Sequence, residues 1–323
     1  MVVESIGTWW MWAGFFVFVI AVLALDLFVL GGNTVHRISI KEAAGWSVAW
    51  VVVALVFNAG LWWHVAGMQG DRVANEKALE FFTGYLIEKS LALDNLFVWL
   101  MLFRYFDVPA EYQRRVLLYG VLGAIVMRTV MILAGAWLIA RFHWVLYLFG
   151  LFLIVTGLKM LIFANHQPDL EKNPVLRWMR GRLKITPIFH AERFFVTHEG
   201  SRHVTPLFLV LVLVEITDLV FAVDSIPAIF AITEDPFIVL TSNVFAILGL
   251  RAMYFLLRDI ADRFHLIKYG LAIVLLFVGA KILLADLYKI PILTALLIVA
   301  LILAASMIVS LLTTRKPEAR NVR

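Results

Sequence analysis

Two apolar stretches of the sequence each contain a pair of acidic residues with the same spacing. The stretch GYLIEKSLALDN holds Glu88 and Asp94, and DLVFAVDSI holds Asp218 and Asp224, with five residues between the acids in both cases. A charged side chain at the centre of a membrane span costs about 2.5–3.5 kcal/mol on insertion scales, so such residues face a bundle interior or an aqueous cavity. The pairs are therefore predicted to line a functional site inside a membrane.

Further oxygen-bearing side chains accompany these carboxylates. Glu215 lies one turn before Asp218, and Asn95 and Ser225 directly follow the second acid of each pair. Carboxylate, amide and hydroxyl oxygens suit hard divalent ions such as Mg²⁺, Ca²⁺ and Mn²⁺ better than Zn²⁺ or Cu⁺. The predicted metal ligands are Glu88, Asp94, Glu215, Asp218 and Asp224. The predicted auxiliary residues are Asp26, Ser90, Asn95 and Ser225.

The spacing of the acids limits how one helix can present both of them. Six residues correspond to about 240° of rotation and about 9 Å of rise on an ideal helix, so Glu88 and Asp94 do not share a face. Ser90 and Asp94 do, as residues i and i+4. If both acids serve one site, the helix is distorted or a partner helix supplies the remaining contacts. In the second stretch Pro227 frees the carbonyl of Val223, and carbonyls freed in broken helices are typical cation ligands.

Basic residues near the acids offer a structural alternative. Arg128 and Arg251 lie deep in predicted helices, where they could pair with carboxylates merely to specify packing. Two arginines, however, cannot neutralise five carboxylates. Lys89, beside Glu88, is interpreted as either a gate or a local counter-charge. Asp26 lies near the inner end of the first predicted helix and is explained equally well as an interfacial residue or as an entry ligand.

The composition is that of an integral membrane protein. Of the 323 residues, 63% are hydrophobic and 16% are charged, whereas soluble domains average about 25% charged residues. Apolar runs of about 20 residues predict an all-α polytopic protein with about nine transmembrane helices in a single transmembrane domain over 1–323. The predicted spans are 9–31, 45–67, 79–103, 115–139, 144–164, 207–231, 237–257, 266–286 and 291–313. The chain has no cysteine, which excludes disulfides, thiolate metal sites and thiol redox chemistry.

Lysines and arginines are unevenly divided between alternate loops. One set of loops, together with the tail at 314–323, contains most of them. The other set holds only four, Arg72, Lys77, Arg141 and Lys289. By the positive-inside rule, the N-terminus is predicted to lie outside and the C-terminus in the cytoplasm. The polar segment at 165–206 is predicted to be a basic cytoplasmic loop with one surface helix around Pro174–Leu183.

The paired acids belong to an internal repeat. Three further landmarks follow in the same order in both halves: Arg128 and Arg251, the RFH tripeptides at 141–143 and 263–265, and Lys159 and Lys281. The units, 79–164 and 207–287, are each three helices long, so the second enters the membrane from the opposite side. The last helix, 291–313, lies outside them. Inverted repeats of this kind are a transporter architecture with the substrate site between the repeats near the midplane.

At these motifs the chain resembles the TerC family of membrane proteins, which is named for tellurite resistance. The resemblance rests on LDL at 25–27 with HRISIKEA at 36–43, FFTGYLIEKSLALDNLFVW at 81–99, EITDLVFAVDSIPAIFAIT at 215–233 and SNVFAILGLRAMYFLL at 242–257. The family resembles the lysine-exporter superfamily and is implicated in Mn²⁺ export and metal homeostasis. The resemblance therefore implies Mn²⁺ as the transported ion, the bacterial inner membrane as the location, and the five acids as the metal path.

The sequence thus leads to the expectation of a transporter, not an enzyme, that exports Mn²⁺ through an acidic site between inverted repeats and uses no cofactor. The alternative is a structural or stress-response membrane protein whose buried acids only stabilise the bundle. A third reading, a membrane redox enzyme, requires a bound chromophore. The expected partners are a divalent metal ion and the lipid bilayer, and a homo-oligomer is compatible with the sequence. Nucleic acid is not expected, because the basic residues lie in loops without interleaved aromatic residues.

Overall fold

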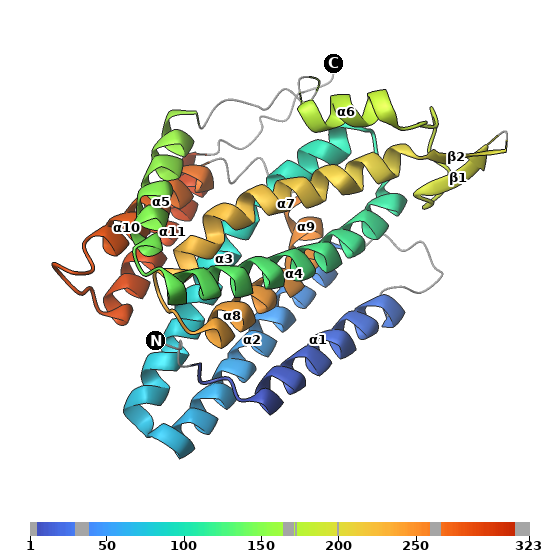
Figure 1. The fold of residues 1–323 in the computed structure, drawn as a ribbon. Coiled ribbons are helices and arrows are strands. Elements are labelled where there is room, and N and C mark those ends of the chain that lie inside the picture. The colour runs from blue at the N-terminus through green and yellow to red at the C-terminus, as the bar shows by residue number, and fades with distance from the viewer. Residues whose placement is uncertain are drawn as a thin grey trace.

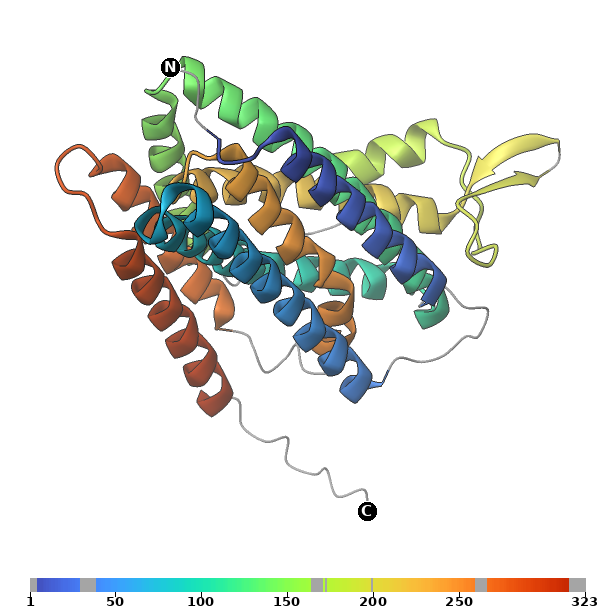
Figure 2. The same ribbon diagram turned by 90° about the horizontal axis from the view of Figure 1, so that it is seen from below.

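The structure of the chain is a computed structural model. It describes residues 5–29, 39–163, 171, 173–198, 200–258 and 266–313, without the side chains of 25–29 and 198. Long helices lie side by side in a bundle, and a small two-stranded hairpin projects from one end (Figures 1 and 2). The helices are α1 (Trp9–Val29), α2 (Ile40–Gln69), α3 (Asp71–Tyr105), α4 (Ala110–Arg141), α5 (Val145–Ile162), α6 (Pro174–Arg182), α7 (Pro206–Phe230), α8 (Pro236–Leu248), α9 (Leu250–Arg258), α10 (Ile267–Leu283) and α11 (Ile292–Thr313). The strands are β1 (Phe195–His198) and β2 (Ser201–Val204).

The predicted fold class, an all-α polytopic membrane protein, is confirmed. Within the described part of the chain, six segments are long and apolar enough to cross a membrane: α2, α4, α5, α7, the α8–α9 segment and α11. Each of the other predicted spans also has a helix, namely α1, α3 and α10. The helix α3 carries too many charged residues to be counted on composition, and α10 is 17 residues long. The number of nine membrane crossings remains a prediction.

One predicted span is interrupted. The sequence predicts a continuous helix over 237–257, but the helix α8 ends at Leu248 and α9 begins at Leu250. Gly249, between them, has φ −86° and ψ −1°, and its N–H donates to the carbonyl of Ile247. This tighter turn leaves α8 with carbonyls that the next turn does not fully satisfy. The hydrophobic pattern continues through the break, which is why composition alone predicts one helix.

The polar segment between α5 and α7 contains more structure than its sequence suggested. The predicted surface helix is present as α6, which begins after Asn173; the Asn173 side chain accepts hydrogen bonds from the backbone N–H groups of Val175 and Leu176. The helix packs on α7. The antiparallel pair β1–β2 was not predicted. Gly200, with φ +72°, occupies the turn between the strands, in a backbone conformation that favours glycine.

An aromatic cluster joins the first three helices to α8. The rings of Phe57 and Phe245 lie 4.6 Å apart, those of Phe57 and Phe81 5.3 Å apart, and those of Phe15 and Phe245 5.9 Å apart. Each of these distances is in the range for favourable aromatic pairs. The cluster therefore fixes α1, α2, α3 and α8 as one packed unit.

The helices α5 and α10 pack against each other at unusually close range. A Cβ atom at Gly279 would lie 2.7 Å from the carbonyl oxygen of Gly150, and one at Gly157 would lie 2.9 Å from the carbonyl oxygen of Ala272. Real Cβ atoms do not approach other atoms that closely, so the contact depends on glycine. Small residues that let backbones approach are a common means of joining helices in membranes.

These contacts have the symmetry that an inverted repeat would produce. The repeat landmarks, aligned at their two lysines, pair Gly150 with Ala272 and Gly157 with Gly279. Each close contact therefore maps onto the other when the two halves are exchanged. A two-fold axis between the repeats gives this pattern. The pattern supports the inverted repeat, which stays a prediction.

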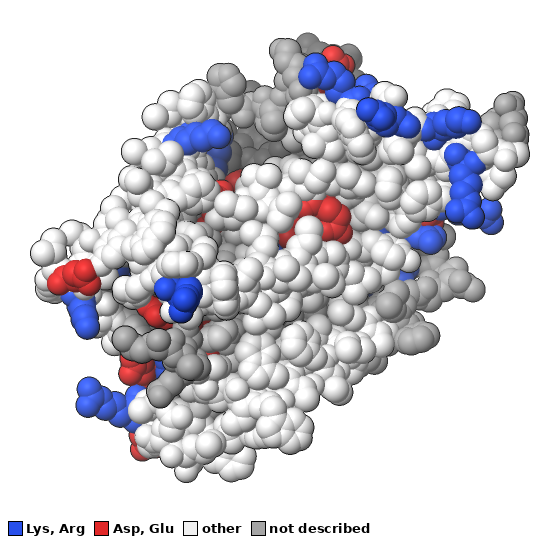
Figure 3. Space-filling model, in the orientation of Figure 1, with Lys and Arg blue, Asp and Glu red and all other residues white. Residues whose placement is uncertain are grey.

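Charge is distributed as expected of a membrane protein. Figure 3 shows lysines and arginines gathered near α6 and the β-hairpin at one end and a second charged group at the opposite end. A broad zone with few charges separates the two, and an acidic patch interrupts it. Many large hydrophobic side chains are exposed on the long helices, including Val17, Ile20, Val126, Val130 and Leu301. Such exposure suits contact with lipid rather than water.

Candidate functional site

A buried arginine stands at the centre of the bundle. Arg128 of α4 is 1% exposed and forms ion pairs with Glu88 of α3 and Asp218 of α7, which are equally buried. Its Nη2 lies 2.9 Å from Asp218 Oδ1 and its Nε lies 3.2 Å from Asp218 Oδ2, so Arg128 binds this carboxylate in a bidentate manner. One acid from each predicted repeat is thus attached to the same guanidinium.

Neutral polar groups complete the surroundings of Arg128. The Asn95 amide nitrogen donates to Asp218 Oδ1 at 3.0 Å. Arg128 Nη1 also lies 3.3 Å from the Ser225 hydroxyl and 3.4 Å from the Asn243 amide oxygen, and donates to both. Because one guanidinium faces two carboxylates, the group carries a formal charge of −1 when all three are ionised, and the neutral donors and acceptors reduce the cost of burying it.

Asn243 was not among the residues selected from the sequence. It lies on α8 in the run Thr241-Ser242-Asn243, and all three residues are fully buried. Three consecutive polar residues in an otherwise apolar segment were the available signal. Sequence reasoning passed over them because no acid accompanies them. The contact with Arg128 shows that α8 contributes to the same polar centre as α3, α4 and α7.

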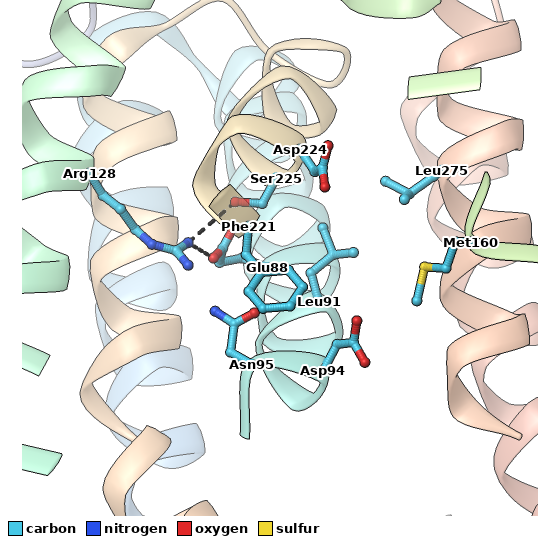
Figure 4. Close-up of a pocket in the computed structure, with 10 residues that line it drawn as sticks. All are labelled: Glu88, Leu91, Asp94, Asn95, Arg128, Met160, Phe221, Asp224, Ser225 and Leu275. Carbon is cyan, nitrogen blue, oxygen red and sulfur yellow. Dashed lines mark hydrogen bonds and ion pairs between the residues drawn. The ribbon is translucent and has the colours of Figure 1, made fainter. Parts of the chain in front are cut away.

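A small cavity adjoins this polar centre. Its volume is about 30 Å³, enough for one or two water-sized particles. The residues that line it are Glu88, Leu91, Asp94, Asn95, Arg128, Met160, Phe221, Asp224, Ser225 and Leu275. In Figure 4 the carboxylates of Asp94 and Asp224 point toward the side where Met160 and Leu275 lie, while Arg128 approaches from the opposite side. The cavity therefore separates α3 and α7 from α5 and α10.

Oxygen atoms beside the cavity remain without a protein partner. Glu88 Oε2 and Asn95 Oδ1 are buried and accept no hydrogen bond from the part of the chain that the structure describes. Figure 4 shows the Asn95 amide with its oxygen on the cavity side and its nitrogen turned away. Leaving a buried acceptor unpaired costs about 1–3 kcal/mol, so such atoms mark a place for a water molecule, an ion or another polar ligand.

The five predicted metal ligands are divided between three environments. Glu88 and Asp218 hold Arg128, whereas Asp94 and Asp224 are half-buried at the cavity. Glu215 packs against Gly123 of α4, where a Cβ atom would overlap its carboxylate oxygens, and it does not line the cavity. No three acidic or histidine side chains among the described residues converge as a ready-made metal cluster.

The structure places the predicted auxiliary residues in different surroundings. Asn95 and Ser225 line the cavity, but the hydroxyl of Ser90 donates to the Leu86 carbonyl one turn back at 2.7 Å. Arg251 is buried on α9, and the cavity lining does not include it. Asp26 lies in α1, and its side chain falls outside what the structure describes.

The six-residue spacing of Glu88 and Asp94 does not require a break in α3. The helix α3 runs continuously from Asp71 to Tyr105, yet Glu88 and Asp94 both border the cavity. Glu88 is fully buried and reaches Arg128, while Asp94 lies further along the cavity wall across from α5. Both acids therefore border one cavity from an unbroken α3, and Arg128 of α4 holds Glu88.

Asp224 is also held by the neighbouring repeat helix. The hydroxyl of Thr156 on α5 donates to Asp224 Oδ1 at 3.2 Å. Thr156 precedes Met160 by one turn, so α5 presents both side chains to the same region. The helix that faces the acids thus fixes one oxygen of Asp224.

Lys89, predicted as a gate or a counter-charge, lies at the break between α8 and α9. Its ammonium donates to the carbonyl oxygen of Ala246 at 3.1 Å. A Cβ atom at Gly249 would lie 2.5 Å from the Lys89 nitrogen and 3.2 Å from Trp50 Cβ. A cation at the C-terminal end of a helix is favourable because it meets the negative end of the helix dipole. Lys89 therefore stabilises the interrupted span.

Replacing Gly249 with alanine is expected to lower the melting temperature of the detergent-solubilised protein, because the added methyl displaces Lys89 from Ala246. Overpacking of this kind costs about 1–3 kcal/mol. Gly60→Ala in α2 is the matched control, since nothing lies within 4 Å of its added Cβ and alanine is the better helix former. Tryptophan fluorescence during heating measures both. Equal melting temperatures for the two variants would contradict the assigned contact.

Comparison with known proteins identifies the family. Residues 73–318 match the family described as "Integral membrane protein TerC family". The chain belongs to the TerC family. The match starts in α3 and extends past α11, so it includes every helix that contributes to the polar centre and the cavity. No solved structure matches the chain.

Full-length relatives of this TerC protein are found among curated bacterial proteins. Alx of Salmonella typhi is 55% identical over 307 residues, covering 95% of both chains. Alx of Escherichia coli K12 is 55% identical over 307 residues, covering 95% of this chain and 96% of its own. Both are named as proposed membrane-bound redox modulators. A membrane protein of Myxococcus xanthus, described as uncharacterized, is 47% identical over 311 residues, 96% of this chain and 95% of that one.

Proposed function

We propose that this TerC protein is a bacterial inner-membrane transporter that exports Mn²⁺ from the cytoplasm. One observation carries the proposal. Asp94 and Asp224, from two different helices, border a cavity of about 30 Å³ inside the bundle, beside buried oxygens that accept no hydrogen bond from the described residues. An acidic cavity between two halves of a membrane protein fits a path for a cation.

The cavity chemistry favours a divalent cation as the substrate. The charged and polar groups around it are mainly carboxylates and an amide, which are ligands for hard divalent ions. An ion of charge +2 would offset the charges of Asp94 and Asp224 together. Selection of Mn²⁺ among such ions rests on the likeness to the family rather than on the donor atoms.

The Arg128 group supplies a fixed partner for the two remaining acids. One oxygen of Glu88 accepts from Arg128, and the other, beside the cavity, accepts no hydrogen bond within the part of the chain that the structure describes. An ion in the cavity would therefore be within reach of a carboxylate that is already held in place. In this proposal Asp94 and Asp224 contact the ion directly, and Glu88 and Asp218 connect it to the rigid polar centre.

The orientation follows the positive-inside rule, with the N-terminus outside and the C-terminus in the cytoplasm. Export then runs from the side of α6 and the β-hairpin toward the side where α2 meets α3. In Figure 3 the basic side chains near α6 lie at the proposed cytoplasmic end.

Transport by purified protein in liposomes is the test. Wild-type protein is expected to move Mn²⁺ down an imposed gradient, and Asp94→Asn or Asp224→Asn is expected to reduce the initial rate by at least about tenfold, a loss of about 1.4 kcal/mol in transition-state stabilisation. Asp71→Asn, at the exposed start of α3, is the control for removing a carboxylate from the same helix. Wild-type rates for both cavity variants at equal protein content would refute the proposal.

A second candidate function is a structural or stress-response membrane protein. The ion pairs of Arg128 favour it, because a fully buried network can serve packing alone. It predicts that the amide variants lower protein abundance and leave metal movement per molecule unchanged. The redox role in the name of the relatives could not use a thiol here, because the chain has no cysteine.

A further inference from the structure

The cavity wall opposite the two acids contains a sulfur atom. Met160 of α5 is half-buried and is the one sulfur-bearing residue among the ten that line the cavity. Figure 4 shows its side chain directed into the gap across from Asp94, with Leu275 of α10 beside it. A cavity built only to hold a hard ion would be expected to place oxygen here.

A thioether discriminates between classes of divalent ion. It is a soft ligand, whereas Mg²⁺ and Ca²⁺ take oxygen ligands and gain little from sulfur. Divalent transition-metal ions accept sulfur more readily than Mg²⁺ and Ca²⁺ do; Mn²⁺ lies at the lower end of the first-row series, and the soft ion Cd²⁺ accepts sulfur more readily than Mn²⁺. The volume of about 30 Å³ adds to this selection, since it leaves little room for the water molecules that Mg²⁺ releases reluctantly.

Packing alone would also place methionine in an irregular space. Methionine fills gaps in apolar cores, and Met160 packs beside the buried cluster that includes Leu153 and Leu271. This role needs a flexible apolar side chain but no sulfur. Leucine supplies nearly the same volume without a donor atom, so the two roles are separable by experiment.

We infer that Met160 is a specificity-determining residue, which makes the cavity prefer transition-metal ions over Mg²⁺ and Ca²⁺. The inference rests on the proposed transport function and names the class of ion that the site accepts. In it, Asp94 and Asp224 supply charge and oxygen ligands, while the sulfur of Met160 supplies the contact that alkaline-earth ions use poorly. Asn95, with its free amide oxygen turned toward the cavity, adds a neutral donor.

Competition assays with three variants test this role. Mn²⁺ flux into liposomes is measured with increasing Mg²⁺ or Cd²⁺ on the same side, for wild type, Met160→Leu and Met160→Gln. Met131→Leu in α4, a partly buried methionine outside the cavity lining, is the control. Met160→Leu is expected to weaken inhibition by Cd²⁺ by about tenfold, which corresponds to about 1.4 kcal/mol. Met160→Gln, which offers an oxygen at a similar reach, is expected to strengthen inhibition by Mg²⁺.

The outcomes separate this inference from the transport function. If Met160→Leu and Met160→Gln carry Mn²⁺ but keep the wild-type response to Cd²⁺ and Mg²⁺, the specificity role is overturned and transport stands. If Met131→Leu shifts the response as much as Met160→Leu, the effect is general packing and the role is likewise overturned. Failure of the transport function has a different signature, because then Asp94→Asn and Asp224→Asn leave the Mn²⁺ flux unaltered.

Discussion

Replacing Arg128 with methionine is expected to destabilise the protein by about 3–5 kcal/mol, because removal of one partner leaves a buried charge uncompensated. Arg128 joins Glu88 and Asp218, and all three side chains are no more than 1% exposed. Methionine fills part of the space but cannot donate a hydrogen bond. The carboxylates would then be buried together without a counter-charge. A large fall in the melting temperature of the detergent-solubilised protein would show the effect.

Two further variants keep this prediction testable if Arg128→Met does not fold. Arg128→Lys retains the charge but loses the bidentate contact with Asp218, so an intermediate loss of stability is expected. The triple variant Arg128→Met, Glu88→Gln, Asp218→Asn removes the charges together, and its melting temperature should recover much of the loss. If the triple variant were no more stable than Arg128→Met, charge compensation would not be the function of this group.

Enlarging Gly279 to leucine is expected to separate α5 from α10 and to cause the second large loss of stability. Even a single added carbon would lie 2.7 Å from the carbonyl oxygen of Gly150 and 2.8 Å from Ile154 Cγ1. The carbonyl oxygen of Gly150 belongs to the backbone and cannot rotate away as a side chain can, so the helices must move apart. Overpacking costs about 1–3 kcal/mol of stability, and leucine is expected to cost about 3 kcal/mol or more. Gly279→Ala should give a smaller loss in the same direction.

The repeat provides a second, equivalent position at which the same effect is expected. Gly157 corresponds to Gly279 in the other half, and its added Cβ meets the carbonyl oxygen of Ala272 at 2.9 Å. Gly157→Leu and Gly279→Leu are therefore expected to lower the melting temperature by similar amounts. Gly67→Leu on α2, where nothing lies within 4 Å, controls for adding leucine to a helix. Unchanged melting for both α5–α10 variants would show that this contact does not hold the halves together.

The same helices form the far wall of the cavity. Met160 belongs to α5 and Leu275 to α10, while Asp94 and Asp224 belong to α3 and α7. The glycine-dependent contact therefore holds one wall as a unit opposite the acidic wall. A shift of this pair would change the cavity width, which connects the packing of the repeats to the proposed path.

Much of the fold was predictable because lipid imposes strong rules on sequence. A backbone in a membrane must satisfy its own hydrogen bonds, so apolar runs of sufficient length become helices. The helices of the predicted spans follow from that rule. The break at Gly249 did not follow from it, since the apolar pattern continues there and the break depends on Lys89 reaching Ala246 from α3. The β-hairpin lies in a polar segment, and the requirement that lipid places on apolar runs does not apply to it.

The sequence by itself determined that the charged core of the site lies inside the bundle, because a carboxylate or arginine in an apolar span is too costly to retain on the lipid side. Glu88, Asp218 and Arg128 were selected on that ground, and the structure buries all three. Only the tertiary structure decided how the acids divide, with Glu88 and Asp218 on Arg128 and Asp94 and Asp224 at the cavity. Spacing along a helix gives angle and rise, but partners such as Asn243 and Met160 come from other helices. Their approach is set by the packing of α8 on α4 and of α5 on α7 and α10.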